Sequence, residues 1–316
     1  MNQANVLFDV VGHLAATVAF LGVAGYVTVR RRLITRTVRR SRTIYWLMLF
    51  ACLLFALTHT ARLVFLFTRG MSSLPAWPDL VSDYPSLIGQ GLVIVALTHL
   101  QVVGTHSAAR RRILAVGAHP DDIEIACGAT LAKMRDEGSQ VWGLVMTQGE
   151  KGGNGHIRPC EAQRGAEFLG LDHMQIFDLP DTRLQERAQD VHAVIERVIR
   201  EFKPDLILTH SPHDLHQDHR TVHEATLRAS CDFYTILCYE SPSVTQEFTP
   251  TFFSNIGDYL DVKVEGIREH WDQRSKPYVQ EERVRGTAVF RGGQARLRYA
   301  EGFEVIHTAA ATRGEA

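Results

Sequence analysis

Two short clusters of histidines and aspartates stand about a hundred residues apart in this chain. His119-Pro120-Asp121-Asp122 follows one apolar segment, and His216-Gln217-Asp218-His219 follows another. Imidazoles and carboxylates are common zinc ligands, and a hydrolytic zinc site uses about three of them and leaves one position for water. The residue types therefore predict a metal-dependent hydrolase, with His119, Asp122 and His219 as the metal ligands.

The other members of the two clusters are suited to proton transfer and charge stabilisation. Neighbouring extended residues point to different sides, so Asp121 can face the attacking water as a general base. His216 is placed to reach the carbonyl oxygen as charge develops there, and Asp218 can orient a histidine from behind. An aspartate pair that only caps a helix is the structural alternative. The loop that leads to the second cluster holds two further histidines, interpreted as loop residues: His210 and His213.

The segments that must position these clusters alternate between strand and helix patterns. Expected strands cover 113–118, 141–147, 174–179, 206–209 and 236–239. Expected helices cover 123–137, 159–169, 186–202 and 219–230. This alternation predicts an α/β fold with a doubly wound, mainly parallel sheet. Ligands in such sheets bind beyond the carboxyl ends of the strands, and both clusters directly follow expected strands.

The first hundred residues are far more apolar than the remainder. Three segments are predicted to be transmembrane helices: 10–29, 44–67 and 87–103. Three buried helices of a soluble bundle are the alternative. Arginines between the first two segments and after the third place the N-terminus outside and the catalytic part in the cytoplasm. The expected organisation is a transmembrane region (1–109), a catalytic domain (110–308) and a short tail (309–316).

The overall composition narrows the function classes. The chain has 34 Lys and Arg against 35 Asp and Glu, for a formal net charge of −1. It therefore lacks the overall positive charge that is typical of nucleic-acid-binding proteins. The five cysteines form no CxxC pair, which favours reduced thiols. The glycine-rich segment 149–155 does not match a phosphate-binding loop, and the absence of GxSxG disfavours a serine hydrolase.

Several motifs between residues 112 and 307 resemble those of the PIG-L/LmbE-type de-N-acetylases. Residues 118–124 resemble the family's AHPDDxE motif, and 216–219 resemble its HxDH motif. Further matches are Thr147 to Glu150 (TxGE), Arg158 and Glu161 (RxxE), Leu179 to Asp181 (LPD), Lys263, His270 and Gln273 (KxxALxxHxSQ), and Tyr299 to Phe303 (YAExF). Asp272 and Gly266 replace a serine and an alanine of the family pattern. The resemblance does not extend to the apolar N-terminal region.

This resemblance implies a Rossmann-like fold and removal of acetyl groups, mostly from N-acetylglucosamine units. It implies Zn²⁺ on His119, Asp122 and His219. It also implies Asp121 as the base and His216 as the electrostatic partner of the tetrahedral intermediate. Four further positions are expected to bind substrate: Arg158, Asp181, Lys263 and His270.

The combined expectation is a membrane-anchored zinc deacetylase that converts the acetamide of a lipid-linked amino sugar into acetate and a free amine. The partners are then an amino-sugar or glycolipid substrate and the lipid bilayer. Deacetylation of a soluble amino-sugar conjugate is one alternative, and a non-catalytic membrane scaffold is another. The two-histidine, one-carboxylate set also suits Fe²⁺, as in ferrous oxygenases. A base beside the ligands favours hydrolysis.

Overall fold

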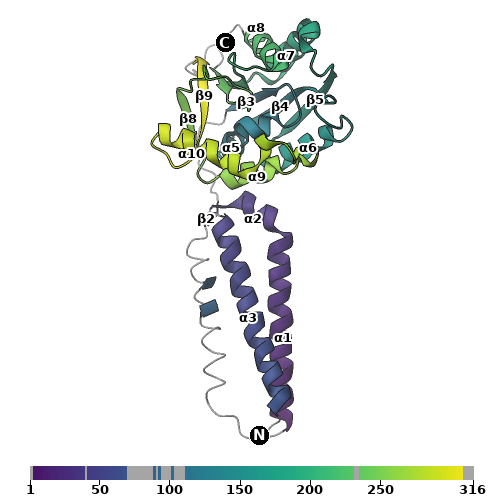
Figure 1. The fold of residues 1–316 in the computed structure, drawn as a ribbon, viewed down its shortest axis with the longest axis vertical. Coiled ribbons are helices and arrows are strands. Elements are labelled where there is room, and N and C mark those ends of the chain that lie inside the picture. The colour runs from purple at the N-terminus through teal and green to yellow at the C-terminus, as the bar shows by residue number, and fades with distance from the viewer. Residues whose placement is uncertain are drawn as a thin grey trace. The chain divides into compact units, whose positions relative to one another are not determined.

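The protein was analysed as a computed structural model that describes residues 3–39, 41–69, 88–89, 92–93, 101–102, 111–230 and 235–308. The chain divides into two compact units, residues 1–103 and 104–316 (Figure 1). Most of the third expected transmembrane segment, 87–103, and the whole tail, 309–316, lie outside the described residues.

The first unit is built from two long helices, α1 (Gln3–Val29) and α3 (Ser41–Arg69). Its shorter elements are α2 (Arg31–Thr37) and an antiparallel pair, β1 (Val38–Arg39) and β2 (Gln101–Val102). Helices α1 and α3 contact each other through stacked Phe20 and Phe55 rings, whose centroids lie 4.5 Å apart.

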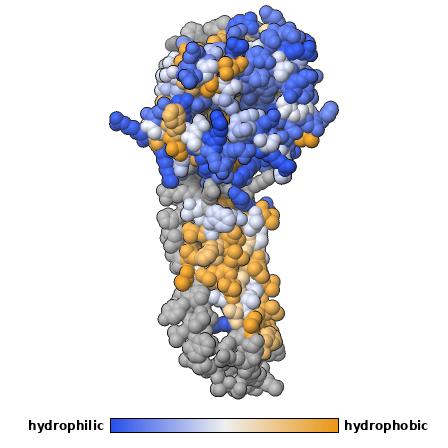
Figure 2. Space-filling view, viewed as in Figure 1, coloured by the Kyte–Doolittle hydropathy of each residue, from blue (hydrophilic) through white to orange (hydrophobic). Residues whose placement is uncertain are grey.

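Both long helices are apolar over a length that can cross a bilayer. The stretches Val10–Val29 and Thr43–Val64 have a mean hydropathy of 1.8, yet only 11% and 28% of their most apolar windows are buried within the protein. Figure 2 shows apolar side chains gathered over this unit. The sequence prediction of apolar spans is therefore confirmed for two helices, not three, in the described part of the chain.

The second unit contains a seven-stranded sheet of order β5-β4-β3-β6-β7-β9-β8. Five strands run parallel: β3 (Arg112–Gly117), β4 (Gln140–Thr147), β5 (His173–Leu179), β6 (Leu206–His210) and β7 (Thr235–Tyr239). Two antiparallel strands complete the edge beyond β7: β8 (Phe252–Asn255) and β9 (Ala300–His307). The mainly parallel sheet was predicted, whereas the antiparallel edge pair was not.

Helices cover both faces of this sheet (Figure 1). The α-helices are α5 (Asp122–Asp136), α6 (Arg158–Leu169), α7 (Ala188–Phe202), α8 (Gln217–Ala229), α9 (Leu260–Ile267) and α10 (Glu281–Gln294). Short 3-10 helices are η1 (Leu184–Arg187), η2 (Trp271–Gln273) and η3 (Pro277–Val279). Alternate residues of β3 point to opposite faces, so Ile113 packs in the core with α5 and α6, and Leu114 packs with α7 and α8.

The strand order explains why two distant clusters meet. β3 pairs with β4 on one side and with β6 on the other, with Ile113 opposite Leu206. The order of strands along the chain therefore reverses between β3 and β6, which is where α/β sheets open a crevice for ligands. The loop after β3 carries 119–121 and leads into Asp122, the first residue of α5, and the loop after β6 leads to His216, the N-cap of α8.

Candidate metal centre and active site

The three predicted ligands converge on one point at this crevice. The Nδ1 atom of His119 lies 3.2 Å from Nε2 of His219. Asp122 places one carboxylate oxygen 3.5 Å from the first nitrogen and the other oxygen 3.5 Å from the second. All three side chains are buried within the protein.

These separations fit a shared divalent cation. Ligand atoms bound tetrahedrally to zinc at about 2.0–2.1 Å stand roughly 3.3 Å from one another, close to the observed values. Other buried His and Asp groups at the centre overlap with this set, including one that pairs Asp122 and His219 with His210. The Nε2 atom of His210, however, accepts a hydrogen bond from the backbone N–H of Ala118 at 3.1 Å, so its lone pair is not free to bind a metal. The donor set His119, Asp122 and His219 is thus placed to share a cation, beside the overlapping group of His119, His216 and His219.

Buried carboxylates hold the far sides of both histidine rings. The Nε2 atom of His119 lies 3.2 Å from Asp218 and 3.2 Å from Asp181. The Nδ1 atom of His219 lies 2.9 Å from Asp214. Such contacts fix the ring orientation and leave the opposite nitrogen for a metal. Asp218 therefore contacts the His119 ring, and Asp214, which the sequence analysis missed, contacts the His219 ring.

Asp214 is itself held by a small hydrogen-bonded network. Ser243 donates its hydroxyl to Asp214 Oδ1 at 2.7 Å, and Ser241 donates to the other oxygen. These contacts and the His219 partner outweigh burial and hold the pKa of Asp214 well below its usual range. A permanently charged carboxylate behind His219 favours the tautomer that presents a bare Nε2 to a cation.

Asp121 has an unusual backbone conformation at the start of α5. Its φ is 115°, in a region that side-chain-bearing residues rarely adopt. Strain of this kind concentrates at functional sites. Oδ1 accepts a hydrogen bond from Nη2 of Arg158 at 3.1 Å, whereas Oδ2 is buried and has no hydrogen-bond partner within the described residues. Burial, together with nearby Asp122, outweighs the Arg158 charge and raises the pKa of Asp121 to about 6.

His216 is the N-cap of α8 and lines the same cavity as Asp121. Its ring is 4.7 Å from that of His119 and 4.6 Å from that of His219. Burial and these two neighbouring imidazoles lower its pKa, which keeps the ring neutral near pH 7. Its Nδ1 accepts the backbone N–H of Asp218 at 3.3 Å, so the ring proton stands on Nε2. His216 can therefore donate a hydrogen bond while carrying no charge.

A cavity of about 410 Å³ opens over this centre. Most predicted site residues line it: His119, Asp121, Asp122, Arg158, Asp181, His216 and His219. Arg158 donates to the carbonyls of Gly149 and Pro120, both at 2.7 Å, as well as to Asp121. Its guanidinium therefore holds Asp121 and the surrounding loops, rather than pointing freely at a ligand.

Two predicted substrate-binding residues lie elsewhere. Lys263 contacts Glu301 at 2.6 Å and lines a neighbouring cavity. His270 is buried beside Glu124 at 3.2 Å and lines neither cavity. Burial alone would lower the pKa of His270, but Glu124, followed by Asp121, raises it above its ordinary value. The structure therefore places His270 against Glu124, within electrostatic reach of Asp121 and outside the walls of the metal cavity.

The Glu124–His270 pair depends on a glycine in α6. A Cβ added at Gly165 would lie 2.6 Å from a Glu124 oxygen and 3.2 Å from His270. We expect Gly165→Ala to destabilise the fold by about 1–3 kcal/mol, because this buried pair cannot retreat into solvent. Gly286 in α10 has nothing within 4 Å of its added Cβ, and Gly286→Ala should stabilise by about 0.5–1 kcal/mol. Urea unfolding monitored by circular dichroism measures both. Equal stability of the two variants would contradict this account.

Comparison with known proteins agrees with the geometry. The family described as "PIG-L: GlcNAc-PI de-N-acetylase" matches residues 114–230. "Uncharacterized deacetylase YaiS" of Escherichia coli (strain K12) is 35% identical over 168 residues, which is 51% of this chain and 91% of that protein. "Diacetylchitobiose deacetylase" of Thermococcus kodakarensis is 28% identical over 226 residues, 62% of this chain and 83% of that protein.

A solved structure shares the fold. The N,N'-diacetylchitobiose deacetylase from Pyrococcus horikoshii superposes with a TM-score of 0.56 at 23% identity, over 65% of this chain and 88% of that one. At this identity the likeness bears on architecture alone, and the sequence relatives carry the family assignment. The chain belongs to the PIG-L/LmbE de-N-acetylases, a family of metal-dependent amidohydrolases.

Proposed function

We propose that this protein removes the acetyl group from an N-acetylglucosamine-type conjugate, with His119, Asp122 and His219 holding Zn²⁺. One observation carries the proposal. A buried carboxylate oxygen of Asp121 has no hydrogen-bond partner in the described part of the chain, and Asp121 lines the same cavity as three converging ligands. A bound cation would acidify water and polarise the acetamide carbonyl. The other steps fall to the protein's own side chains.

Asp121 accepts a proton from the attacking water through its free Oδ2, while Arg158 keeps Oδ1 in place. As negative charge develops on the carbonyl oxygen, His216 donates a hydrogen bond to it from Nε2. Protonated Asp121 then returns its proton to the departing nitrogen. The C–N bond breaks, and acetate and a free amino sugar are released. Asp181 lies at the cavity wall, suited to accept a hydrogen bond from a sugar hydroxyl.

The test is direct. Full-length protein in a neutral detergent is incubated with N-acetylated glucosaminides, and acetate and primary amine are both quantified. We expect the two products in equal amounts. Oxygen-dependent turnover, or release of the aglycone without acetate, would overturn the proposal.

The two apolar helices support a membrane-bound form of this enzyme, acting on a lipid-linked conjugate at the cytoplasmic face. The arginines that follow α1 favour this orientation. A C-terminal tag should then resist protease added to intact cells and become sensitive after permeabilisation. Cleavage of the tag in intact cells would reverse the topology. Faster turnover of a soluble conjugate than of its lipid-linked form would favour the soluble substrate.

A further inference from the structure

Asp272 stands where the family pattern has a serine, and it contacts the glycine-rich segment 149–155. Its Oδ2 atom accepts two hydrogen bonds, one from the backbone N–H of Asn154 at 3.1 Å and one from Nε2 of Gln273 at 2.8 Å. Hydrogen bonds to a carboxylate are about twice as strong as those between neutral groups. A single oxygen atom of Asp272 therefore joins the glycine-rich segment to η2.

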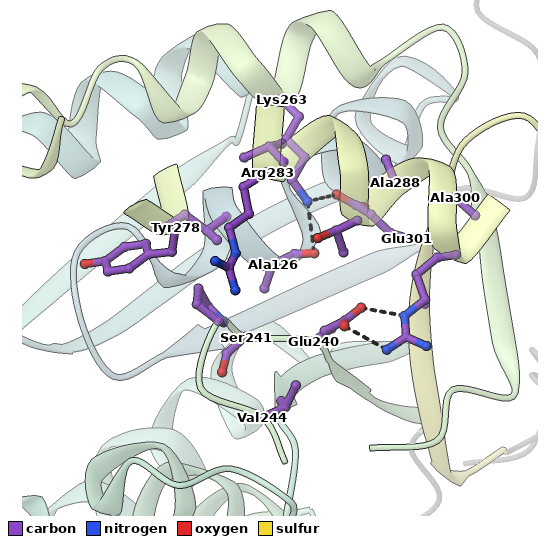
Figure 3. A pocket seen from close by; sticks show the side chains of 16 residues that line it. Ala126, Glu240, Ser241, Val244, Lys263, Tyr278, Arg283, Ala288, Ala300 and Glu301 are labelled. Atoms are coloured by element: carbon purple, nitrogen blue, oxygen red, sulfur yellow. Dashed lines mark hydrogen bonds and ion pairs between the residues drawn. The ribbon is translucent and has the colours of Figure 1, made fainter. Parts of the chain in front are cut away.

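The buried side chain of Gln273 extends this connection. Its Nε2 also donates to the carbonyl of Gly152 at 3.4 Å, and its Oε1 accepts a hydrogen bond from the hydroxyl of Tyr278 at 3.2 Å. Gly152, Gln273 and Tyr278 all line the metal cavity. Tyr278 also lines the neighbouring cavity of about 250 Å³, and Figure 3 shows its hydroxyl directed away from the other labelled side chains there. We call the connected residues the clasp: Gly152, Asn154, Asp272, Gln273 and Tyr278.

Buried carboxylates hold the clasp at both ends. Both oxygens of Glu161 in α6 accept the backbone N–H of Asp272, each at 3.2 Å. On the side of the loop, Asp181 Oδ2 accepts the backbone N–H of Lys151 at 2.7 Å. The other oxygen of Asp181 lies 3.2 Å from Nε2 of the proposed ligand His119. A displacement of the loop would therefore affect both the wall of the metal cavity and a residue that contacts His119.

Gly153 provides the space for this arrangement. A Cβ added at Gly153 would overlap Oδ2 of Asp272 and would lie 2.7 Å from Nε2 of Gln273. Gly153 is not among the glycines with a positive φ, so its backbone conformation does not require a glycine. The close approach of the carboxylate does. The carboxylate at position 272 and the missing side chain at position 153 therefore depend on each other.

We propose that Asp272 is a positioning residue, which holds the glycine-rich segment against η2 and so fixes the part of the metal-cavity wall that receives the substrate. This inference rests on the proposed deacetylation and adds to it a group that acts through the loop, not on the reacting atoms. The clasp contains no proposed metal ligand, base or oxyanion donor. Loss of Asp272 should therefore weaken substrate binding more than it slows the chemical step.

The experiment combines hydrogen–deuterium exchange with kinetics on full-length protein in a neutral detergent, using the methyl glycoside of N-acetylglucosamine. In Asp272→Ala the amide of Asn154 should exchange at least about tenfold faster, because its acceptor is gone. KM should rise roughly tenfold through displacement of the wall, while kcat stays within about threefold. Asp272→Asn keeps an acceptor oxygen and should restore most of the KM. Asp178→Ala removes an exposed carboxylate on β5 and should change neither exchange nor KM.

Gly153→Ala tests the same contact from the side of the loop. Its new methyl group would overlap Asp272, so this variant should also raise KM and speed the exchange of Asn154. In the double variant Gly153→Ala, Asp272→Ala the overlapping carboxylate is absent, and KM should equal that of Asp272→Ala within about twofold. Fully additive effects would mean that the two residues act separately, which contradicts the clasp.

Three other results would overturn the proposal. The first is unchanged exchange and KM in both single variants. The second is faster exchange with an unchanged KM, because the loop would then move without affecting the substrate. The third is a lower urea midpoint of Asp272→Ala with a normal KM, which would assign Asp272 to folding alone.

The failure of the clasp and the failure of the deacetylation are distinguishable. Absence of acetate from the unmodified protein would reject the reaction. Calorimetric binding of the methyl glycoside, with and without Asp272→Ala, would then test the clasp, and roughly tenfold weaker binding by the variant would support it. Acetate release with a normal KM in every variant would reject the clasp and leave the reaction.

Discussion

Asp121→Asn should lower kcat for acetate release by about 10²–10⁴-fold, the range expected when a general acid–base group is lost. The amide keeps the size of the carboxylate and an oxygen for the Arg158 hydrogen bond, so the loop geometry should survive. It cannot take a proton from water at Oδ2. We therefore expect little change in KM and the same metal content by elemental analysis.

The matched control is Asp178→Asn, which removes an exposed carboxylate on β5. Its kcat should equal that of the unmodified protein. Asp121→Asn with normal kcat would remove Asp121 from the mechanism. Asp121→Asn with lost metal would instead mean that this residue helps to hold the cation, directly or through the adjacent Asp122.

The parallel part of the fold could be predicted because it follows from local patterns, and so could the edge of the sheet at which both clusters lie. Each buried strand reads as an apolar run, and its end can be placed within a residue or two. Parallel strands place their following loops on one edge, so 119–122 and 216–219 could be expected to meet. The adjacency of β3 and β6 itself comes from tertiary packing, which no local pattern encodes.

The supporting groups were harder to predict. Asp214 was missed, although an acid five residues before His219 was a visible signal; its contact with Nδ1 depends on how the loop after β6 turns back. His210 was interpreted as a loop residue, yet it ends β6, fully buried, with its ring centroid 3.8 Å from that of His219.

The role of the C-terminal motif could not be predicted from the sequence. Lys263 and His270 match family positions, but a motif match does not show where a side chain points. Lys263 neutralises Glu301, which also accepts the backbone N–H of Thr130 in α5 at 2.8 Å. That contact ties α9 and β9 to α5. The motif residues thus support the helix that begins at the ligand Asp122, a role that spacing alone does not distinguish from substrate binding.

Removing the cation should abolish acetate release to the background rate, because the metal would both acidify the attacking water and polarise the carbonyl. We expect chelation followed by gel filtration to inactivate the protein, and one equivalent of Zn²⁺ to restore it. Asp214→Asn should raise the Zn²⁺ concentration needed for half-recovery by about 10–100-fold, as loss of an outer-shell carboxylate usually does. Asp190→Asn, which removes an exposed carboxylate paired with Arg187, should not shift that concentration.

The zinc titration would distinguish a role of Asp214 in stabilising the fold from a role in positioning His219, which an activity assay cannot distinguish. If Asp214 only stabilised the fold, Asp214→Asn would unfold at lower urea concentration with its zinc titration unchanged. If it sets the tautomer of His219, the titration shifts while the unfolding midpoint of the zinc-loaded protein moves little, because His219 would still be held by the metal. Full activity after complete metal removal would contradict both the ligand set and the hydrolytic mechanism. The zinc titration of Asp214→Asn therefore tests the centre through a residue that touches neither the substrate nor the metal.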